Sequence, residues 1–165
     1  MAYIKKDHHG GLSAGEMQTD FSGFQKAVQA FQASDYKKTV RLCRAILKKH
    51  AGNTETMHLL GIALLESGSS SDAEQWVRKA IRMAPNNPEY HFSLGNILQA
   101  MGRLPEAVKS FEAVLSLAPE HGAASYNIGN LYLKEGAYEK SLRFFRKATE
   151  YSPDSAGAWH NYGVA

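Results

Sequence analysis

Residues 88–121 read PEYHFSLGNILQAMGRLPEAVKSFEAVLSLAPEH, and the 34 residues that follow read GAASYNIGNLYLKEGAYEKSLRFFRKATEYSPDS. The two segments carry glycines and prolines at the same spacing, for example Gly95 with Gly129 and Pro119 with Pro153. Self-similarity at a period of this length is typical of chains built from stacked copies of one supersecondary unit. The first question is therefore which unit repeats, and how far along the chain.

The period of 34 residues extends through most of the 165-residue chain. Two series of glycines and one of prolines share it: Gly61, Gly95, Gly129 and Gly163; Gly68, Gly102 and Gly136; Pro85, Pro119 and Pro153. The prolines divide the chain into units at 54–87, 88–121 and 122–155, with a weaker unit at 20–53 and a truncated first helix of a further unit at 156–165. Residues 1–19 show little periodicity, and we expect a flexible tail there.

Each unit contains the pattern of two helices. In the unit 88–121, His91, Leu94, Gly95 and Leu98 have i, i+3, i+4 and i+7 spacing, and Ala107, Phe111 and Val114 repeat this spacing in a second segment. This is the spacing of one face of a helix. Gly102 stands between the two segments, where a left-handed residue can end a helix without a Cβ penalty, and Pro119 disfavours helix beyond the second. The sequence therefore predicts an all-α fold of antiparallel helix pairs.

The glycine inside the first helix of each unit needs a reason, because it costs about 1 kcal/mol relative to alanine. Close approach of the second helix would supply that reason. The small residues predicted to face the gap are Ala73, Ala107 and Ser141, with Val77, Phe111 and Phe145 filling the space one turn further on.

This pattern resembles the tetratricopeptide repeat (TPR) family, whose signature is W-x2-L-G-x2-Y, then A-x3-F, then P. Three consecutive units match it: Met57-x2-Leu60-Gly61-x2-Leu64, Ala73-x3-Val77 and Pro85; His91-x2-Leu94-Gly95-x2-Leu98, Ala107-x3-Phe111 and Pro119; Ser125-x2-Ile128-Gly129-x2-Tyr132, Ser141-x3-Phe145 and Pro153. The resemblance implies a TPR solenoid, a right-handed superhelix in which stacked units bury what no unit can bury alone.

The two ends depart from the pattern in different ways. Residues 20–53 lack the leucine and glycine of the first helix, which suits a degenerate capping repeat because one of its faces has no neighbour. At the other end, Trp159-x2-Tyr162-Gly163 is typical of an internal repeat. We therefore expect the native protein to continue beyond residue 165.

The resemblance to TPR proteins also implies a concave groove, lined by the first helices, that binds peptides. The residues at the family's groove-facing positions are His58, Ile62, Phe92, Asn96, Gln99, Tyr126, Asn130, Lys134 and His160. Aromatic rings give contact area, and amide side chains can hydrogen-bond the backbone of an extended peptide. The alternative is that these side chains only form a solvated inner face.

Two TPR subfamilies bear on the ligand. Co-chaperones that clamp a C-terminal carboxylate use Lys and Arg in the groove, whereas this chain has Gly157 and Asn161 where the later cations would fall. Asn127 and Asn161 resemble instead the asparagine ladder on the TPR arms of protein O-glycosyltransferases, although Leu59 and Ser93 interrupt it. We count both asparagines among the candidate groove residues.

Basic residues are concentrated near the N-terminal end. Residues 20–53 carry seven Lys and Arg against two Asp, whereas residues 54–165 carry ten basic and twelve acidic side chains. Lys37, Arg41, Arg44 and Lys48 have i, i+4, i+7, i+11 spacing and form one stripe, which either meets an anionic partner or is a solvated convex face. The stripe has no interleaved aromatic residues to stack bases, which argues against a nucleic-acid partner.

Nothing in the sequence points to catalysis. Cys43 takes a core position and is expected to be a buried, inert thiol, and no histidine has zinc-ligand spacing with a suitable partner. We find no G-x-S-x-G, P-loop or H-E-x-x-H motif, so we expect no enzyme activity, metal or cofactor in these residues. A single cysteine, no secretory signal and no bilayer-length apolar run suggest a cytoplasmic protein without a membrane partner.

Three functions fit these observations. The first is a scaffold that binds a peptide or protein partner in the groove. The second is a substrate-recruiting N-terminal arm of a larger, glycosyltransferase-like enzyme whose catalytic part lies beyond residue 165. The third is a homotypic assembly module, in which terminal repeats stack end to end into a homo-oligomer.

Overall fold

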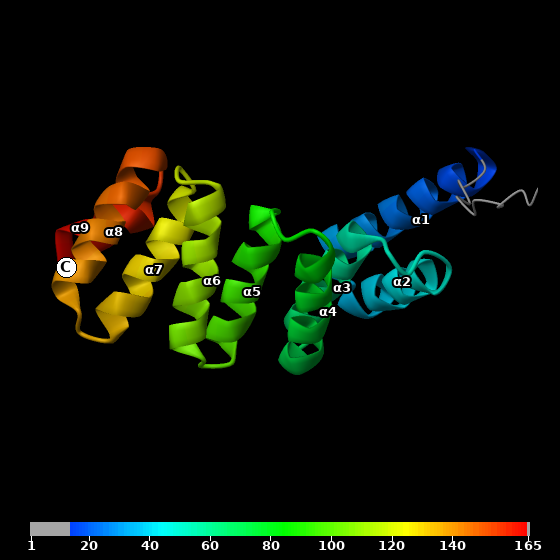
Figure 1. Ribbon diagram of the computed structural model, residues 1–165, viewed down its shortest axis with the longest axis horizontal. Coiled ribbons are helices and arrows are strands. Elements are labelled where there is room, and N and C mark those ends of the chain that lie inside the picture. Colours follow the sequence, from blue (N-terminus) through cyan, green and yellow to red (C-terminus); the bar gives the residue numbers. More distant parts are fainter. Residues whose placement is uncertain (1–13, 165) are drawn as a thin grey trace, which may run out of the picture.

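The chain forms a row of helices that runs from one end of an elongated molecule to the other (Figure 1). The computed structural model describes residues 14–164, with side chains from 22 to 163. The helices in this part of the chain are α1 (Ala14–Gln32), α2 (Tyr36–Lys49), α3 (Thr54–Glu66), α4 (Ser70–Met83), α5 (Pro88–Ala100), α6 (Leu104–Leu117), α7 (Gly122–Lys134), α8 (Tyr138–Tyr151) and α9 (Ala156–Val164). No strand occurs among them, which confirms the predicted all-α solenoid.

Short polar side chains start the first helices at the predicted places. The Asn53 Oδ1 atom accepts a hydrogen bond of 2.8 Å from the Thr56 N–H, and Asn87 accepts one from Glu89 ahead of α5. Pro88 occupies the first turn, where its missing N–H leaves no partner unpaired. His121 caps the start of α7, where its Nδ1 atom accepts a hydrogen bond of 3.1 Å from the Ala124 N–H.

Left-handed residues end the first helices. Gly68, Gly102 and Gly136 have φ values of 84°, 73° and 72°. At the end of α5 the N–H of Gly102 donates to the Gln99 carbonyl, and the next N–H, that of Arg103, donates to Leu98. This pair of bonds is the Schellman motif, which satisfies carbonyls that the helix leaves free. In the weaker first unit the equivalent residue is Ser34, with a φ of 57°.

The interior glycines allow the two helices of a unit to touch. A Cβ atom on Gly95 would lie 2.5 Å from the Phe111 ring, and one on Gly129 would lie 2.7 Å from the Phe145 ring. The close approach is therefore confirmed, but the predicted partners Ala107 and Ser141 are not the nearest ones. The fully buried rings reach back to the glycines because helical side chains lean toward the N-terminus.

Helix α1 begins earlier than the sequence pattern suggested. Residues 14–19, predicted as part of the flexible tail, form its first turns, and residues 1–13 lie outside the part that the structure describes. Glu16, Met17 and Gln18 are good helix formers, so propensity extends this helix beyond the repeat that the periodicity marks. None of the described helices has the length and the apolar character needed to cross a bilayer.

The helices of each unit occupy different faces of the solenoid. The first helices (α1, α3, α5, α7 and α9) approach one another: α1 packs on α3 and α3 on α5, and side-chain hydrogen bonds join α5 to α7 and α7 to α9. We call the surface that they share the inner face. The second helices (α2, α4, α6 and α8) form the outer face.

Candidate peptide-binding groove

Polar side chains of the predicted groove bond across the inner face from one unit to the next. The Asn127 Nδ2 atom donates to Asn96 Oδ1 at 3.1 Å, and Asn161 Nδ2 donates to Asn130 Oδ1 at 2.7 Å. The two pairs are copies of each other, because 34 residues separate Asn96 from Asn130 and Asn127 from Asn161. All four side chains are half-buried. They make one continuous row on α5, α7 and α9.

The amide pairs leave hydrogen-bonding capacity unused. An asparagine has two N–H donors and one carbonyl acceptor. In the first pair the acceptor of Asn96 and one donor of Asn127 are engaged, so the Nδ2 group of Asn96 and the Oδ1 atom of Asn127 have no partner among the described residues. In the second pair the Nδ2 group of Asn130 and the Oδ1 atom of Asn161 have no such partner either. Half-buried donors and acceptors of this kind are suited to the alternating C=O and N–H groups of a peptide.

The aromatic residues of the candidate groove are anchored on one side by the core. The Phe92 ring centroid lies 5.6 Å from that of Phe111 and 5.0 Å from that of His121. Tyr126 lies 6.0 Å from Phe145, and its hydroxyl accepts a hydrogen bond from Asn161 at 3.5 Å. Both rings are half-buried, so each keeps part of its surface on the inner face. They are fixed in place by the same rings that fill the glycine gaps.

The remaining predicted residues contribute unequally. The Gln99 Oε1 atom is buried and has no hydrogen-bond partner among the described residues. Ile62 is half-buried and packs on the core. Lys134 and His160 are exposed, and no interaction ties them to the asparagine row.

The predicted groove residue His58 bonds to Ser93 and continues the polar row toward the N-terminal end, and this role of Ser93 was not predicted from the sequence. The His58 ring Nε2 atom lies 2.7 Å from the Ser93 hydroxyl. Burial lowers the pKa of His58 more than the nearby Glu89 carboxylate raises it, so the ring is neutral at pH 7. Ser93 interrupts the asparagine ladder, yet His58 and Ser93 stand at the repeat positions of Tyr126 and Asn161. Comparing pairs of positions 35 apart would have revealed this equivalence.

Cys43 and the candidate metal ligands are the remaining chemistry-bearing side chains. Burial raises the pKa of Cys43 to about 12, so its thiol stays protonated and unreactive at neutral pH. Among the residues that the structure describes, no group of three or more His, Cys, Asp or Glu side chains is placed to hold a metal ion.

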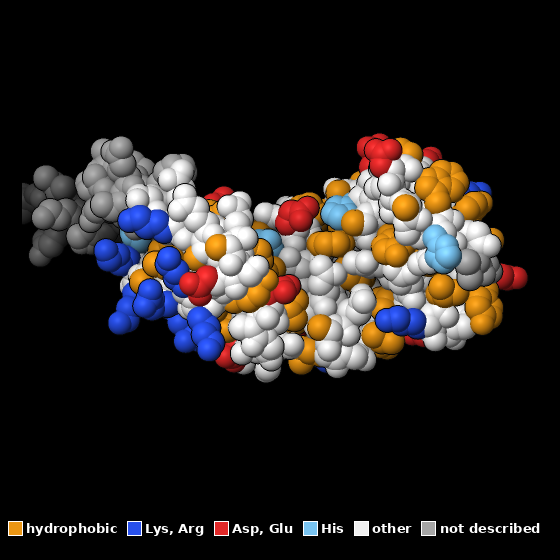
Figure 2. Space-filling model, turned by 180° about the vertical axis from the view of Figure 1, so that it is seen from behind, with side chains coloured by type: hydrophobic (Ala, Val, Ile, Leu, Met, Phe, Trp, Pro, Cys, Tyr) orange, Lys and Arg blue, Asp and Glu red, His pale blue; other side chains and the backbone are white. Residues whose placement is uncertain are grey.

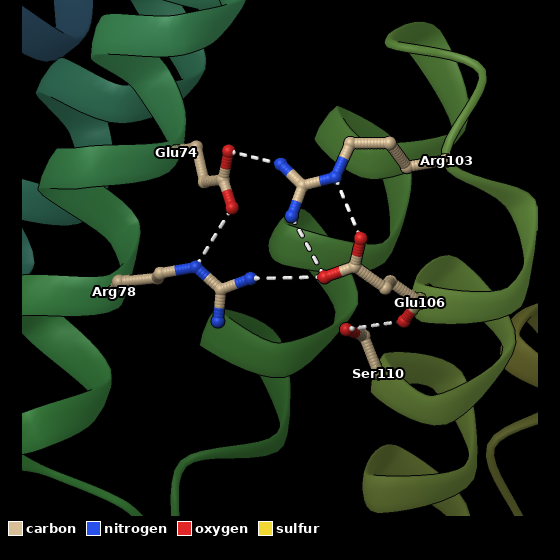
Figure 3. Close-up of polar contacts among 5 residues, drawn as sticks. All are labelled: Glu74, Arg78, Arg103, Glu106 and Ser110. Carbon is tan, nitrogen blue, oxygen red and sulfur yellow. Dashed lines mark hydrogen bonds and ion pairs between the residues drawn. The ribbon is translucent and has the colours of Figure 1, made fainter.

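An ion cluster on the second helices holds two units together (Figure 3). Arg103, ahead of α6, binds Glu74 of α4 at 2.6 Å and Glu106 of α6 at 2.7 Å. Arg78 of α4 binds Glu74 at 2.8 Å and reaches Glu106 at 3.8 Å. We call these four residues the ion quartet. It lies away from the asparagine row and joins neighbouring second helices.

The comparison with protein families agrees with the repeat. Tetratricopeptide repeat family models match residues 30–96 and 92–165. Both models describe the repeat itself. Neither match gives the boundaries of the individual units, which stay a prediction.

Solved structures share the architecture. MamA from Desulfovibrio magneticus RS-1 is 20% identical, with 88% of this chain and 82% of that chain covered and a TM-score of 0.79. YrrB, described as a TPR protein with an unusual peptide-binding site, is 26% identical over 86% of this chain and 73% of that chain, with a TM-score of 0.75. A mutant O-GlcNAc transferase from Thermobaculum terrenum is 23% identical, with a TM-score of 0.78, over 84% of this chain and 27% of that chain. With its repeat pattern, its helix pairs and these matches together, the chain is a member of the tetratricopeptide repeat family.

Proposed function

We propose that the inner face is a protein-interaction groove that binds an extended peptide segment of a partner protein. The observation that carries the proposal is the row of paired asparagines, Asn96 with Asn127 and Asn130 with Asn161. The pair recurs at two successive junctions between units and keeps unused donors and acceptors on the inner face. A ligand with a periodic backbone would use every pair in the same way.

The chemistry of the groove favours a peptide backbone over a particular side chain. The free Nδ2 group of Asn96 can donate to a peptide carbonyl, and the free Oδ1 of Asn127 can accept from a peptide N–H. The exposed surfaces of Phe92 and Tyr126 flank the row and offer apolar contact to side chains. Main-chain hydrogen bonds would give affinity, and the rings would select among sequences.

The likeness to YrrB supports this proposal. YrrB is described as a TPR protein with an unusual peptide-binding site, and it is 26% identical to this chain over the matched residues of the solenoid. MamA and the O-GlcNAc transferase have lower sequence identities, 20% and 23%, and support the fold alone.

The experiment begins with peptides of random sequence displayed on phage and selected against the protein. Affinity of the selected peptides is then measured on Asn96→Asp with Asn130→Asp. Aspartate keeps the Oδ1 acceptor for Asn127 and Asn161 but replaces the free donor with a charged acceptor, so a peptide carbonyl is repelled. We expect affinity to fall at least about tenfold while helicity is unchanged, since a buried acceptor left facing another acceptor costs about 1–3 kcal/mol.

The control is Asn86→Asp, which makes the same chemical change on an exposed loop residue. Affinity unchanged in this variant and reduced in the groove variant would support the proposal. Equal affinity in all three proteins would reject it. Alanine at Phe92 or Tyr126 is a poorer test, because these rings also pack on Phe111 and Phe145.

Two alternatives remain as proposals of narrower support. The first is a recruiting arm of a glycosyltransferase-like enzyme. Its support is the fold that this chain shares with part of the O-GlcNAc transferase, a match that covers 27% of that chain. Homotypic stacking would use the C-terminal end, where Tyr138 and Trp159 are 58% and 52% exposed. Sedimentation of the protein as a monomer at high concentration would reject the second of these.

A further inference from the structure

Positive charge is concentrated on the outer face. The second helices carry fourteen of the nineteen Lys and Arg residues: six on α2, three on α4, one on α6 and four on α8. They carry six of the sixteen Asp and Glu residues, a balance of +8. The first helices carry two basic and five acidic residues, a balance of −3. The formal net charge of +3 therefore hides a strong separation of charge between the two faces.

The row of cations on α2 is the densest part. This helix has no acidic residue, and Lys37, Arg41, Arg44 and Lys48 are all exposed along roughly 16 Å of its length. None of the four forms an ion pair with the residues whose side chains are described. Figure 2 shows Lys and Arg side chains gathered at this end of the molecule.

Hollows between successive second helices collect further cations. A hollow of about 310 Å³ between α4 and α6 is lined by Arg78, Arg82 and Lys109, besides His91. A hollow of about 240 Å³ between α6 and α8 is lined by Lys140, Arg143 and Lys147, with Glu112 as its one carboxylate. Cations of the outer face thus lie on α2, at the hollow between α4 and α6, where Arg78 is also part of the ion quartet, and at the hollow between α6 and α8. We call these three sets together the cationic track.

Aromatic rings lie in the same track. The hollow between α6 and α8 contains Tyr132 and Phe144, with ring centroids 5.8 Å apart. Lys140 lies 5.3 Å from the centre of the Tyr132 ring, and on α4 Lys79 lies 5.1 Å from that of Trp76. The equivalents of Tyr132 and Phe144 in the preceding unit are Leu98 and Ser110. Tyr132 holds the tyrosine position of the TPR signature, whereas Phe144 lies outside the signature, so the repeat does not require the Phe144 ring.

We propose that the outer face binds single-stranded nucleic acid, with phosphates along the cationic track and a base against Phe144 and Tyr132 in the hollow between α6 and α8. Cationic grooves with aromatic platforms are the usual means of binding single strands without sequence preference, because every base has a stacking face. The stripe on α2 lacks aromatic residues, and for that reason the sequence alone argued against a nucleic-acid partner. The rings come instead from α7, which carries Tyr132, and α8, which carries Phe144.

Other polyanions fit the track less well. A bilayer surface would require apolar side chains that project from the basic face. Of the exposed large apolar residues on the second helices, Met83, Leu117 and Tyr151 are the last residues of α4, α6 and α8, and Tyr138 is the first residue of α8. Leu142 of α8 alone lies within a helix, and one such residue is too little for a bilayer surface. An acidic protein segment would gain little from the rings.

The test is fluorescence anisotropy of labelled 20-nucleotide oligo(dT) and oligo(U) titrated with the full chain and with three single variants. Arg143→Glu reverses a charge on the outer face, and Lys26→Glu makes the same change on a first helix. Phe144→Ser installs the residue that the preceding unit has at this position, Ser110. We expect binding that weakens with salt, about fivefold or greater loss in Arg143→Glu and in Phe144→Ser, and little change in Lys26→Glu.

Polyglutamate and phosphatidylserine vesicles, with circular dichroism to check folding, complete the experiment. Preference for oligo(dT) or oligo(U) would identify the natural source as DNA or RNA, and either supports the proposal. No binding of either strand in 50 mM salt would overturn it. So would equal loss in Lys26→Glu and Arg143→Glu, full binding by Phe144→Ser, or polyglutamate or vesicles binding as tightly as the oligonucleotides.

Discussion

Gly95 shows how little space separates the two helices of a unit. An added Cβ would lie 2.5 Å from the Phe111 ring, and that ring is fully buried and also contacts Phe92 of the candidate groove. The glycine therefore positions the groove as well as the core. Its helix-propensity cost of about 1 kcal/mol is offset by the packing of Phe111.

We predict that Gly95→Leu lowers the free energy of unfolding by roughly 1–3 kcal/mol, because overpacking outweighs the gain in helix propensity. Chemical denaturation measures the change. Gly163→Leu is the matched control, because it stands at the equivalent repeat position with nothing within 4 Å of an added Cβ. A Gly95→Leu protein as stable as the native one would show that the contact is not tight.

Ser34 carries backbone strain that the other units avoid. Its φ of 57° is in the left-handed region, where the other units have glycine. We predict that Ser34→Gly raises the free energy of unfolding by about 0.5–1 kcal/mol, since glycine removes a steric cost of about 1–2 kcal/mol and gives part of it back as unfolded-state entropy. Thermal denaturation of this variant beside Gly102→Ser, expected to lose stability, checks the prediction.

At the scale of helices, the ion quartet distinguishes one junction from its neighbours. Val108, Glu112, Ala137 and Lys140 hold the equivalent positions one unit later, so the quartet cannot form there. Burial opposes the ionisation of Glu74, but hydrogen bonds from Arg78 and Arg103 outweigh it and its pKa lies below the ordinary value of 4.5. The hydrogen bond from Arg103 likewise lowers the pKa of Glu106.

These pKa shifts give the junction a pH dependence. Because both carboxyl groups bind protons less readily in the folded state, their contribution to stability is present above pH 4.5 and is lost as the pH falls below it. We predict that Arg103→Gln unfolds at a lower temperature than the native protein at pH 7 and loses less stability between pH 7 and pH 3. Arg82→Gln, outside the quartet, should behave like the native protein. Parallel pH profiles for all three would show that the quartet contributes nothing.

At the scale of the whole molecule, periodicity predicts helices better than it predicts contacts. The glycines and prolines, 34 apart, marked where helices end because those residues act through their own backbone. The groove bonds depend on how one unit turns against the next: Asn96 meets Asn127, 31 residues on, and His58 meets Ser93, 35 residues on. The start of α1 was also missed, because no repeat marks it.

Because contacts between units cannot be predicted from periodicity, the sequence did not reveal the aromatic hollow on the outer face. A stripe on α2 can be found from spacing within one helix. The hollow between α6 and α8 combines Glu112, Tyr132 and Phe144 from three helices, and only stacking brings them together. The inner and outer faces thus offer separate surfaces, one polar and aromatic, the other cationic.

The central claim, that a peptide lies on the paired asparagines, is tested most directly by the side-chain amide signals in a ¹⁵N NMR titration. Adding a phage-selected peptide should shift the NH₂ signals of Asn96, Asn127, Asn130 and Asn161, because their unused donors and acceptors become engaged. The signals of Asn53, Asn86 and Asn87, which lie between units, should stay in place. A peptide that binds while the four groove signals remain unshifted would contradict the claim.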